Sequence, residues 1–153
     1  MSLLGPASPR QLSVGIALVR ILTGCVFVAH GYQKLFVFGI GGATGAFTQM
    51  GIPAPTIVAP LVTILEFAGG IALILGLLTR IVAVGFVIDM LGAIFLVHLK
   101  NGFFLPNGIE FALTLLVTSL ALVIAGAGAF SIDESLARRR TSGVGDAYAR
   151  ATP

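Results

Sequence analysis

The sequence predicts an all-α fold, a bundle of four transmembrane helices. The chain has 153 residues, of which 57% are hydrophobic and 10% are charged, and its mean hydropathy is +1.06. Soluble domains carry about 25% charged residues, so this chain has too little polar surface to cover a globule in water. Its apolar residues fall into four runs, most of them long enough for the ~30 Å hydrocarbon core. The composition therefore predicts a multi-pass membrane protein.

The four runs set the expected organisation. We predict helices at about residues 12–38, 56–78, 80–100 and 108–127, in one membrane domain over 12–130 that lies between an N-terminus at 1–11 and a polar tail at 131–153. Residues 39–55 are rich in Gly and Pro, so we expect a surface loop with a short amphipathic turn over 45–50. Thr79 and Arg80 would form a tight turn. Ser131 and Glu134 have the spacing of a capping box for a short helix through Arg140.

Basic residues set the expected topology. Four spans place both termini on one side of the membrane, together with Arg10 and Arg80, whereas Lys34 and Lys100 lie on the other side. The tail adds Arg138, Arg139, Arg140 and Arg150. Positive charge concentrates on the cytoplasmic side, so we expect both termini in the cytoplasm. This topology accounts for the net charge of +3, and we therefore expect contact with the lipid bilayer and no binding of nucleic acid.

A weak internal repeat agrees with four helices. The first run ends in His30 and Lys34, and the third ends in His98 and Lys100. The second run contains Leu65-Glu66-Phe67-Ala68, and the fourth opens with Ile109-Glu110-Phe111-Ala112. Alternate helices run in the same direction, so the two halves would be parallel helix-pair repeats about an axis along the membrane normal.

Ionisable residues inside a membrane are costly and often functional. A rise of about 1.5 Å per residue places His30, Glu66, His98 and Glu110 in one layer near the outer surface, with Arg20 deeper in the bundle. These five residues are the candidate site.

Asp89 and His98 lie nine residues apart on the third helix, which turns them to nearly opposite faces. We therefore expect His98 inside the bundle, and Asp89 either at a partner interface or paired with Arg20. The second helix has a small-xxx-small stripe, which would let a neighbouring helix approach. This stripe consists of Ala68, Ala72 and Gly76.

Three kinds of chemistry suit two imidazoles and two carboxylates. A quinone needs a hydrogen-bond donor at each carbonyl oxygen and a route for protons, and His and Glu supply both. Ligation of a metal or haem by His30 and His98 is a second option, although the Glu-x-x-His spacing of dimetal bundles is absent from the sequence. The third option is a structural network of His–Glu and Arg–Asp pairs. We interpret Lys34 and Lys100 as snorkelling to the interface.

The same residues carry a resemblance to a known family over almost the whole chain from Val14 to Asp133. The matching stretches are Arg20…His30-Gly31-x-x-Lys34-Leu35-Phe36, Phe47…Gly51-Ile52-Pro53-x-Pro55, Glu66-Phe67-x-Gly69-Gly70…Leu75-Gly76-Leu77-x-Thr79-Arg80, His98…Asn101-Gly102-Phe103-Phe104, Glu110-Phe111-Ala112-Leu113 and Gly126-x-Gly128…Ser131-Ile132-Asp133. Together they resemble the DoxX family of small four-helix bacterial membrane proteins.

The resemblance implies a bacterial inner-membrane location and redox chemistry, because related proteins are subunits of a thiosulfate:quinone oxidoreductase. The matching polar positions are Arg20, His30, Glu66, His98 and Glu110. We therefore expect a quinone-linked redox subunit with protein partners, in which quinone is the expected ligand rather than haem or metal. The alternative is a non-catalytic structural or assembly subunit of a larger respiratory or photosynthetic membrane complex.

Overall fold

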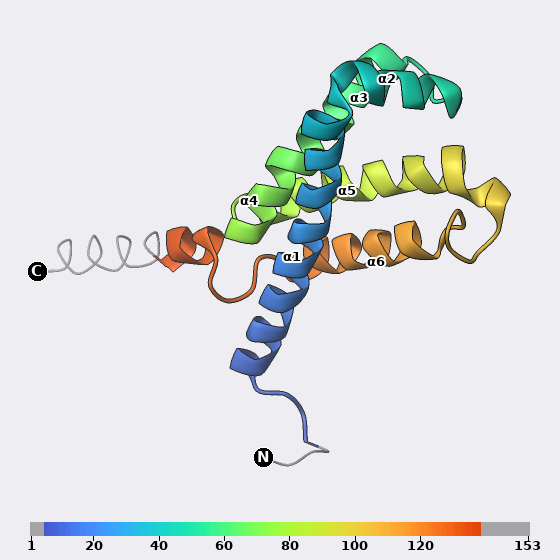
Figure 1. The fold of residues 1–153 in the computed structure, drawn as a ribbon. Coiled ribbons are helices and arrows are strands. Elements are labelled where there is room, and N and C mark those ends of the chain that lie inside the picture. The colour runs from blue at the N-terminus through green and yellow to red at the C-terminus, as the bar shows by residue number, and fades with distance from the viewer. Residues whose placement is uncertain (1–4, 139–153) are drawn as a thin grey trace, which may run out of the picture.

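The computed structural model describes residues 5–138, and every regular element in that range is a helix (Figure 1). In chain order the elements are α1 (Pro9–Tyr32), η1 (Gln33–Val37), α2 (Gly39–Gln49), α3 (Pro55–Ile64), η2 (Leu65–Gly69), α4 (Gly70–Leu75), α5 (Thr79–Gly92), η3 (Ala93–His98), η4 (Leu99–Asn101) and α6 (Glu110–Ala125). A further helix occupies residues 132–138. The segments η1, η2 and η3 are π-helical. The prediction of an all-α fold is confirmed.

Three helical stretches within the described residues are long and apolar enough to cross a membrane. They are Pro9–Val37, Pro55–Leu75 and Thr79–Asn101. The fourth apolar helix, α6, has 16 residues and at about 1.5 Å per residue extends roughly 24 Å, somewhat less than the ~30 Å hydrocarbon core. The fold is thus consistent with a four-helix membrane bundle whose last member is short.

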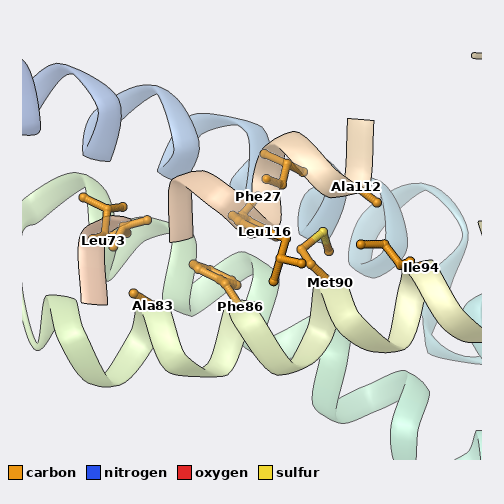
Figure 2. Close-up of a cluster of buried hydrophobic side chains, with 10 residues drawn as sticks. Phe27, Leu73, Ala83, Phe86, Met90, Ile94, Ala112 and Leu116 are labelled. Carbon is orange, nitrogen blue, oxygen red and sulfur yellow. The ribbon is translucent and has the colours of Figure 1, made fainter. Parts of the chain in front are cut away.

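A single apolar core joins the spanning helices. Phe27 of α1 and Phe86 of α5 are fully buried, and their rings stack with centroids 3.6 Å apart. Figure 2 shows Met90 of α5 pointing toward Ala112 and Leu116 on α6. Lipid tails are as apolar as these side chains, so close van der Waals packing, rather than exclusion of water, holds the helices together.

Glycines let α1 lie close against α4 and η2. A Cβ on Gly24 of α1 would lie 2.9 Å from the carbonyl oxygen of Gly70 on α4. A Cβ on Gly31 would overlap the backbone of Phe67 in η2. Close approach through small residues is the usual basis of helix association in lipid. The expected small-residue stripe is not this contact, because its first member, Ala68, is exposed.

The segment after the first span is a helix and not the loop that we predicted. Helix α2 has 11 residues and packs on α3 through Ala43, Phe47 and Ala59, all of which are buried. Figure 1 shows α2 beside α3 at one end of the molecule. Its glycines lower the intrinsic helix propensity, which favoured a loop in the sequence analysis. Tertiary packing stabilises most helices in proteins, and here the contact with α3 outweighs the low propensity.

The turn between α4 and α5 lies earlier than predicted. Helix α4 ends at Leu75 because Gly76 has a φ of +66°, a conformation in which glycine is unstrained. Thr79 is therefore the first residue of α5 rather than part of a turn. The Asp133 carboxylate caps α5 by accepting hydrogen bonds from the N–H groups of Leu78 and Thr79, each at 2.9 Å.

The chain after α6 returns to the start of α1. The N–H of Ala129 donates to the carbonyl of Ser13 at 3.1 Å. The Ser131 hydroxyl accepts from the N–H of Glu134 at 3.2 Å and so caps the helix over 132–138, as the spacing predicted. Arg139 and Arg140, the predicted end of that helix, lie outside the described residues. The start of α1, the α4–α5 turn and the C-terminal segment thus meet at one end of the bundle.

Candidate functional site

Each of the three long spans contains one π-helical segment, and each segment carries one ionisable residue of a shared cluster. Lys34 lies in η1, Glu66 in η2 and His98 in η3. Single π-helical turns within α-helices are rare and are frequent at functional sites. The three side chains, which we call the Lys34–Glu66–His98 cluster, line the same two cavities.

Lys34 and Glu66 form a largely buried ion pair. The Lys34 Nζ lies 2.5 Å from Glu66 Oε2, and the exposed fractions of the two side chains are 20% and 6%. A buried carboxylate needs a counter-charge because the surroundings have a low dielectric constant. Our interpretation of Lys34 as a snorkelling residue is therefore wrong. Lys100 is exposed at the end of its span, as that interpretation requires.

His98 is half-buried and is oriented by the loop that follows it. Its Nδ1 lies 2.9 Å from the backbone carbonyl oxygen of Asn107, which also accepts from the Asn101 side chain at 3.3 Å. A carbonyl oxygen only accepts hydrogen bonds, so Nδ1 carries the proton in this contact. The other ring nitrogen, Nε2, accepts a hydrogen bond when the ring is neutral and donates one when the ring is charged.

The larger cavity has a volume of about 340 Å³ and lies between α2–α3 and α5–η3. Four ionisable residues line it: Lys34, Glu66, Asp89 and His98. The remaining walls are almost entirely apolar and include Phe47 of α2, Met50 directly after α2, Val58 and Val62 from α3, and Ile88, Leu96 and Val97 from the third span. Ile88 is 66% exposed and Leu96 is 46% exposed, so the cavity reaches the apolar outer surface of the bundle.

The smaller cavity has a volume of about 290 Å³ and lies on the α6 side of the same cluster. His30 lines it together with Lys34, Glu66 and His98. The ring centroid of His30 lies 6.0 Å from that of Phe111, which also lines the cavity. The structure thus brings three of the five predicted site residues together, His30, Glu66 and His98.

Asp89 lies in the larger cavity and not where the sequence analysis placed it. Helical spacing predicted opposite faces for Asp89 and His98, yet both residues line this cavity. The π-helical segment η3 lies between them and takes more residues per turn than an α-helix, which changes the direction of His98. Among residues 5–138, Asp89 Oδ2 is buried without a hydrogen-bond partner, so the predicted pairing with Arg20 is absent there.

Arg20 and Glu110 lie apart from the cluster. Arg20 is fully buried, and its Nη2 donates to the carbonyl of Phe130 at 3.0 Å. Asp133 attracts the guanidinium electrostatically, so Arg20 belongs to the end of the bundle that the C-terminal segment closes. Glu110 is the first residue of α6, and its Oε1 accepts from the N–H of Leu105 at 2.8 Å. That bond holds the loop before α6.

No group of three or more His, Cys, Asp or Glu side chains with metal-binding geometry occurs among the described residues. The cluster combines a cation, a carboxylate and an imidazole beside apolar walls. This combination suits hydrogen bonding and proton transfer to polar atoms at the edge of an apolar ring.

Comparison with known proteins identifies the family. The model of the DoxX family matches residues 15–99. The chain belongs to the DoxX family. Among its relatives, the Mycobacterium tuberculosis protein named uncharacterized membrane protein Rv3486 is 34% identical, with 90% of this chain and 93% of that one covered. The Bacillus subtilis protein named "Putative oxidoreductase CatD" is 32% identical over 88% of this chain and 96% of its own length.

A third relative of this DoxX protein is the inner membrane protein YqjF of Escherichia coli, which is 35% identical over 82% of this chain and 95% of its own length. No solved structure matches the chain. The family match and the apolar spans establish a membrane protein that contacts the lipid bilayer. The family model covers Lys34, Glu66, Asp89 and His98, the ionisable residues of the larger cavity.

Proposed function

We propose that this DoxX protein is a quinone-linked redox subunit of a bacterial inner membrane, with both termini in the cytoplasm. One observation carries the proposal. Three π-helical segments bring Lys34, Glu66 and His98 to the walls of the same two cavities, which Asp89 and His30 also line and whose remaining lining is largely apolar. A ligand for this site must combine an apolar ring with polar atoms at its edge, and it must enter from the lipid.

The cluster has the groups that a quinone headgroup requires. Lys34 has three N–H donors, of which Glu66 engages one, so the others are available to a quinone carbonyl oxygen. Glu66 holds the ammonium in place. Reduction of a quinone takes up two protons, and a histidine is suited to deliver them one at a time because an imidazole can both take up and release a proton. His98 has that role in the proposal, and His30 lines the smaller cavity as a second imidazole.

The electrons come from a partner protein or from a small donor molecule. A redox role agrees with the name of the Bacillus subtilis relative, which includes the word oxidoreductase. The location agrees with the names of the Escherichia coli relatives, which are inner membrane proteins. We therefore propose that the chain works together with a protein partner in the membrane.

Binding of a short-chain ubiquinone analogue to the purified protein in lipid nanodiscs tests the proposal. We expect saturable binding by the wild type and a loss of at least about tenfold in affinity for Glu66→Gln and His98→Ala. His98→Ala removes a group that contacts the headgroup, and Glu66→Gln removes the charge that holds Lys34 in place. Lys100→Met is the matched control, because Lys100 is a cationic residue two positions from His98 that lines neither cavity. No saturable binding by the wild type overturns the proposal.

Native mass spectrometry of the protein extracted in mild detergent from its own membranes separates the remaining alternatives. A retained mass of quinone size supports the proposed site. Additional polypeptide mass identifies the redox partner to assay. Additional polypeptide together with unaltered quinone binding by Glu66→Gln and His98→Ala would instead favour the structural-subunit alternative.

A further inference from the structure

The larger cavity contains more negative than positive side chains. Glu66 and Asp89 supply two carboxylates, whereas Lys34 supplies one ammonium, which already pairs with Glu66 at 2.5 Å. Lys34 and Glu66 both lie close enough to Asp89 to act on it electrostatically. A negatively charged ligand would be repelled by this arrangement, and a ligand that only accepts hydrogen bonds would leave Asp89 without a partner.

Asp89 is the group in the cavity that lacks a partner. Its Oδ2 is buried without a hydrogen bond to any residue of 5–138. An unpaired polar atom in an apolar environment is costly, and ionisable residues within a membrane segment usually mark a substrate or proton pathway. An ionised Asp89 only accepts hydrogen bonds, and the partner missing from that form is a donor.

His98 offers a second acceptor in the same cavity. Its Nδ1 donates to the carbonyl of Asn107, so Nε2 of the neutral ring accepts. Beside the Lys34–Glu66 pair, the cavity is therefore lined by two further groups that can accept hydrogen bonds, the Asp89 carboxylate and the His98 imidazole. Its volume of about 340 Å³ falls at the lower end of the ~300–1,000 Å³ typical of small-molecule sites.

We propose that Asp89 makes the larger cavity selective for the reduced, dihydroxy form of the quinone, the quinol. The two quinol hydroxyls would donate to Asp89 and His98, while the ring lies against apolar residues such as Phe47 and Met50. This inference rests on the proposed function, because it names the redox form of the ligand that the site prefers. Asp89 is thereby a specificity-determining residue that the proposed cluster does not include.

Equilibrium binding of three matched probes tests the inference. The probes are a short-chain hydroquinone under anaerobic, reducing conditions, its quinone, and the hydroquinone dimethyl ether, which keeps the ring but cannot donate. We expect the wild type to bind the hydroquinone about tenfold or more tightly than the dimethyl ether, since a hydrogen bond to a charged acceptor contributes at least that ratio. We expect Asp89→Asn to reduce this ratio to less than about threefold, with the affinity for the dimethyl ether unchanged.

The outcomes separate the two proposals. If the wild type binds none of the three probes, the proposed function fails. If the wild type binds the quinone but binds the hydroquinone and the dimethyl ether equally, only the role of Asp89 fails. If Asp89→Asn keeps the full preference for the hydroquinone over the dimethyl ether, the role of Asp89 also fails. The control is Glu134→Gln, because the Glu134 carboxylate lies outside the cavity. We expect Asp89→Asn to fold, because Oδ2 has no hydrogen bond to residues 5–138 that the substitution would break.

Discussion

The two ends of the bundle hold their charged side chains in different ways. At the end closed by the C-terminal segment, which we call the Arg20 end, charged groups bond to the backbone: Arg20 donates to a carbonyl, and Asp133 accepts from two N–H groups. At the opposite end, which we call the Lys34 end, Lys34 pairs with Glu66, and both face cavities. Among residues 5–138, buried polar atoms without a partner occur at both ends, such as Arg20 Nε and Nη1 at the first and Asp89 Oδ2 at the second, but only Asp89 also lines one of these two cavities.

The two ends of the bundle also differ in the regularity of their helical backbone. The Arg20 end has a standard helix stop at Gly76 and a capped start of α5 at Thr79. The Lys34 end contains the π-helical segments η1, η2 and η3. Irregular helical turns are less stable than regular ones and persist where they have a role. The comparison therefore favours a structural role for the Arg20 end, and it agrees with the ligand binding that we propose for the Lys34 end.

Removing the cation of the buried pair should give the largest effect. Lys34→Met leaves Glu66 buried without a counter-charge, and breaking a buried ion pair typically costs ~3–5 kcal/mol. Because Lys34 is 20% exposed, we expect a decrease of about 3 kcal/mol in the free energy of unfolding. Equilibrium unfolding of the protein in mixed detergent micelles measures it, and quinone binding should be lost in the same variant.

A double-mutant cycle shows whether the loss comes from the pair. Lys34→Met combined with Glu66→Leu removes both charges, so its stability should recover most of what Lys34→Met alone loses. Lys100→Met, at an exposed position, should change stability by less than about 0.5 kcal/mol. Equal losses for the single and double variants would mean that the pair does not hold the Lys34 end together.

A methyl group at Gly31 should have the next largest effect. Its Cβ would overlap the backbone of Phe67, the residue after Glu66, so α1 and η2 would have to separate. Overpacking of this kind costs about 1–3 kcal/mol, and the displacement should also weaken quinone binding, because Glu66 lies in η2 and Lys34 lies in η1, which directly continues α1. Thermal unfolding and binding measurements on Gly31→Ala check both effects.

Gly15→Ala is the control for that variant, because Gly15 lies on the same helix and has nothing within 4 Å of an added Cβ. It should be neutral or stabilising by up to about 1 kcal/mol, since alanine favours a helix over glycine. A Gly31→Ala variant as stable as Gly15→Ala would show that α1 and η2 are not in tight contact.

Hydropathy and spacing were enough to predict the helices and which three of the predicted residues line one cavity. The four apolar runs and the outer layer with His30, Glu66 and His98 follow from composition and from a constant rise per residue. Helix α2 was missed because its stability comes from Phe47 packing on α3, a contact between segments that a local pattern does not contain. Glycine content alone indicated a loop at that position.

The placement of Asp89 was missed for a different reason. The prediction assumed a constant 100° per residue from Asp89 to His98, and the π-helical segment η3 breaks that assumption. Lys34 was missed because a lysine near a helix end usually snorkels. The available signal was the matching depth of Lys34 and Glu66, a cation and a carboxylate on neighbouring spans.

A change at the Arg20 end should have the smallest effect and should leave ligand binding intact. Asp133→Asn weakens the cap of α5, because an amide has one oxygen where the carboxylate uses both of its oxygens to accept from Leu78 and Thr79. Loss of a cap lowers the free energy of unfolding by about 1 kcal/mol. The control is Glu134→Gln, which breaks the exposed ion pair of Glu134 with Arg138. We expect this control to lower the free energy of unfolding by less than about 0.5 kcal/mol. Unfolding measured beside quinone affinity is the check: lower stability with unchanged affinity supports the division between the two ends. A coupled loss of affinity would mean that the C-terminal segment positions the Lys34–Glu66–His98 cluster through the bundle, and the two ends would then form one cooperative unit.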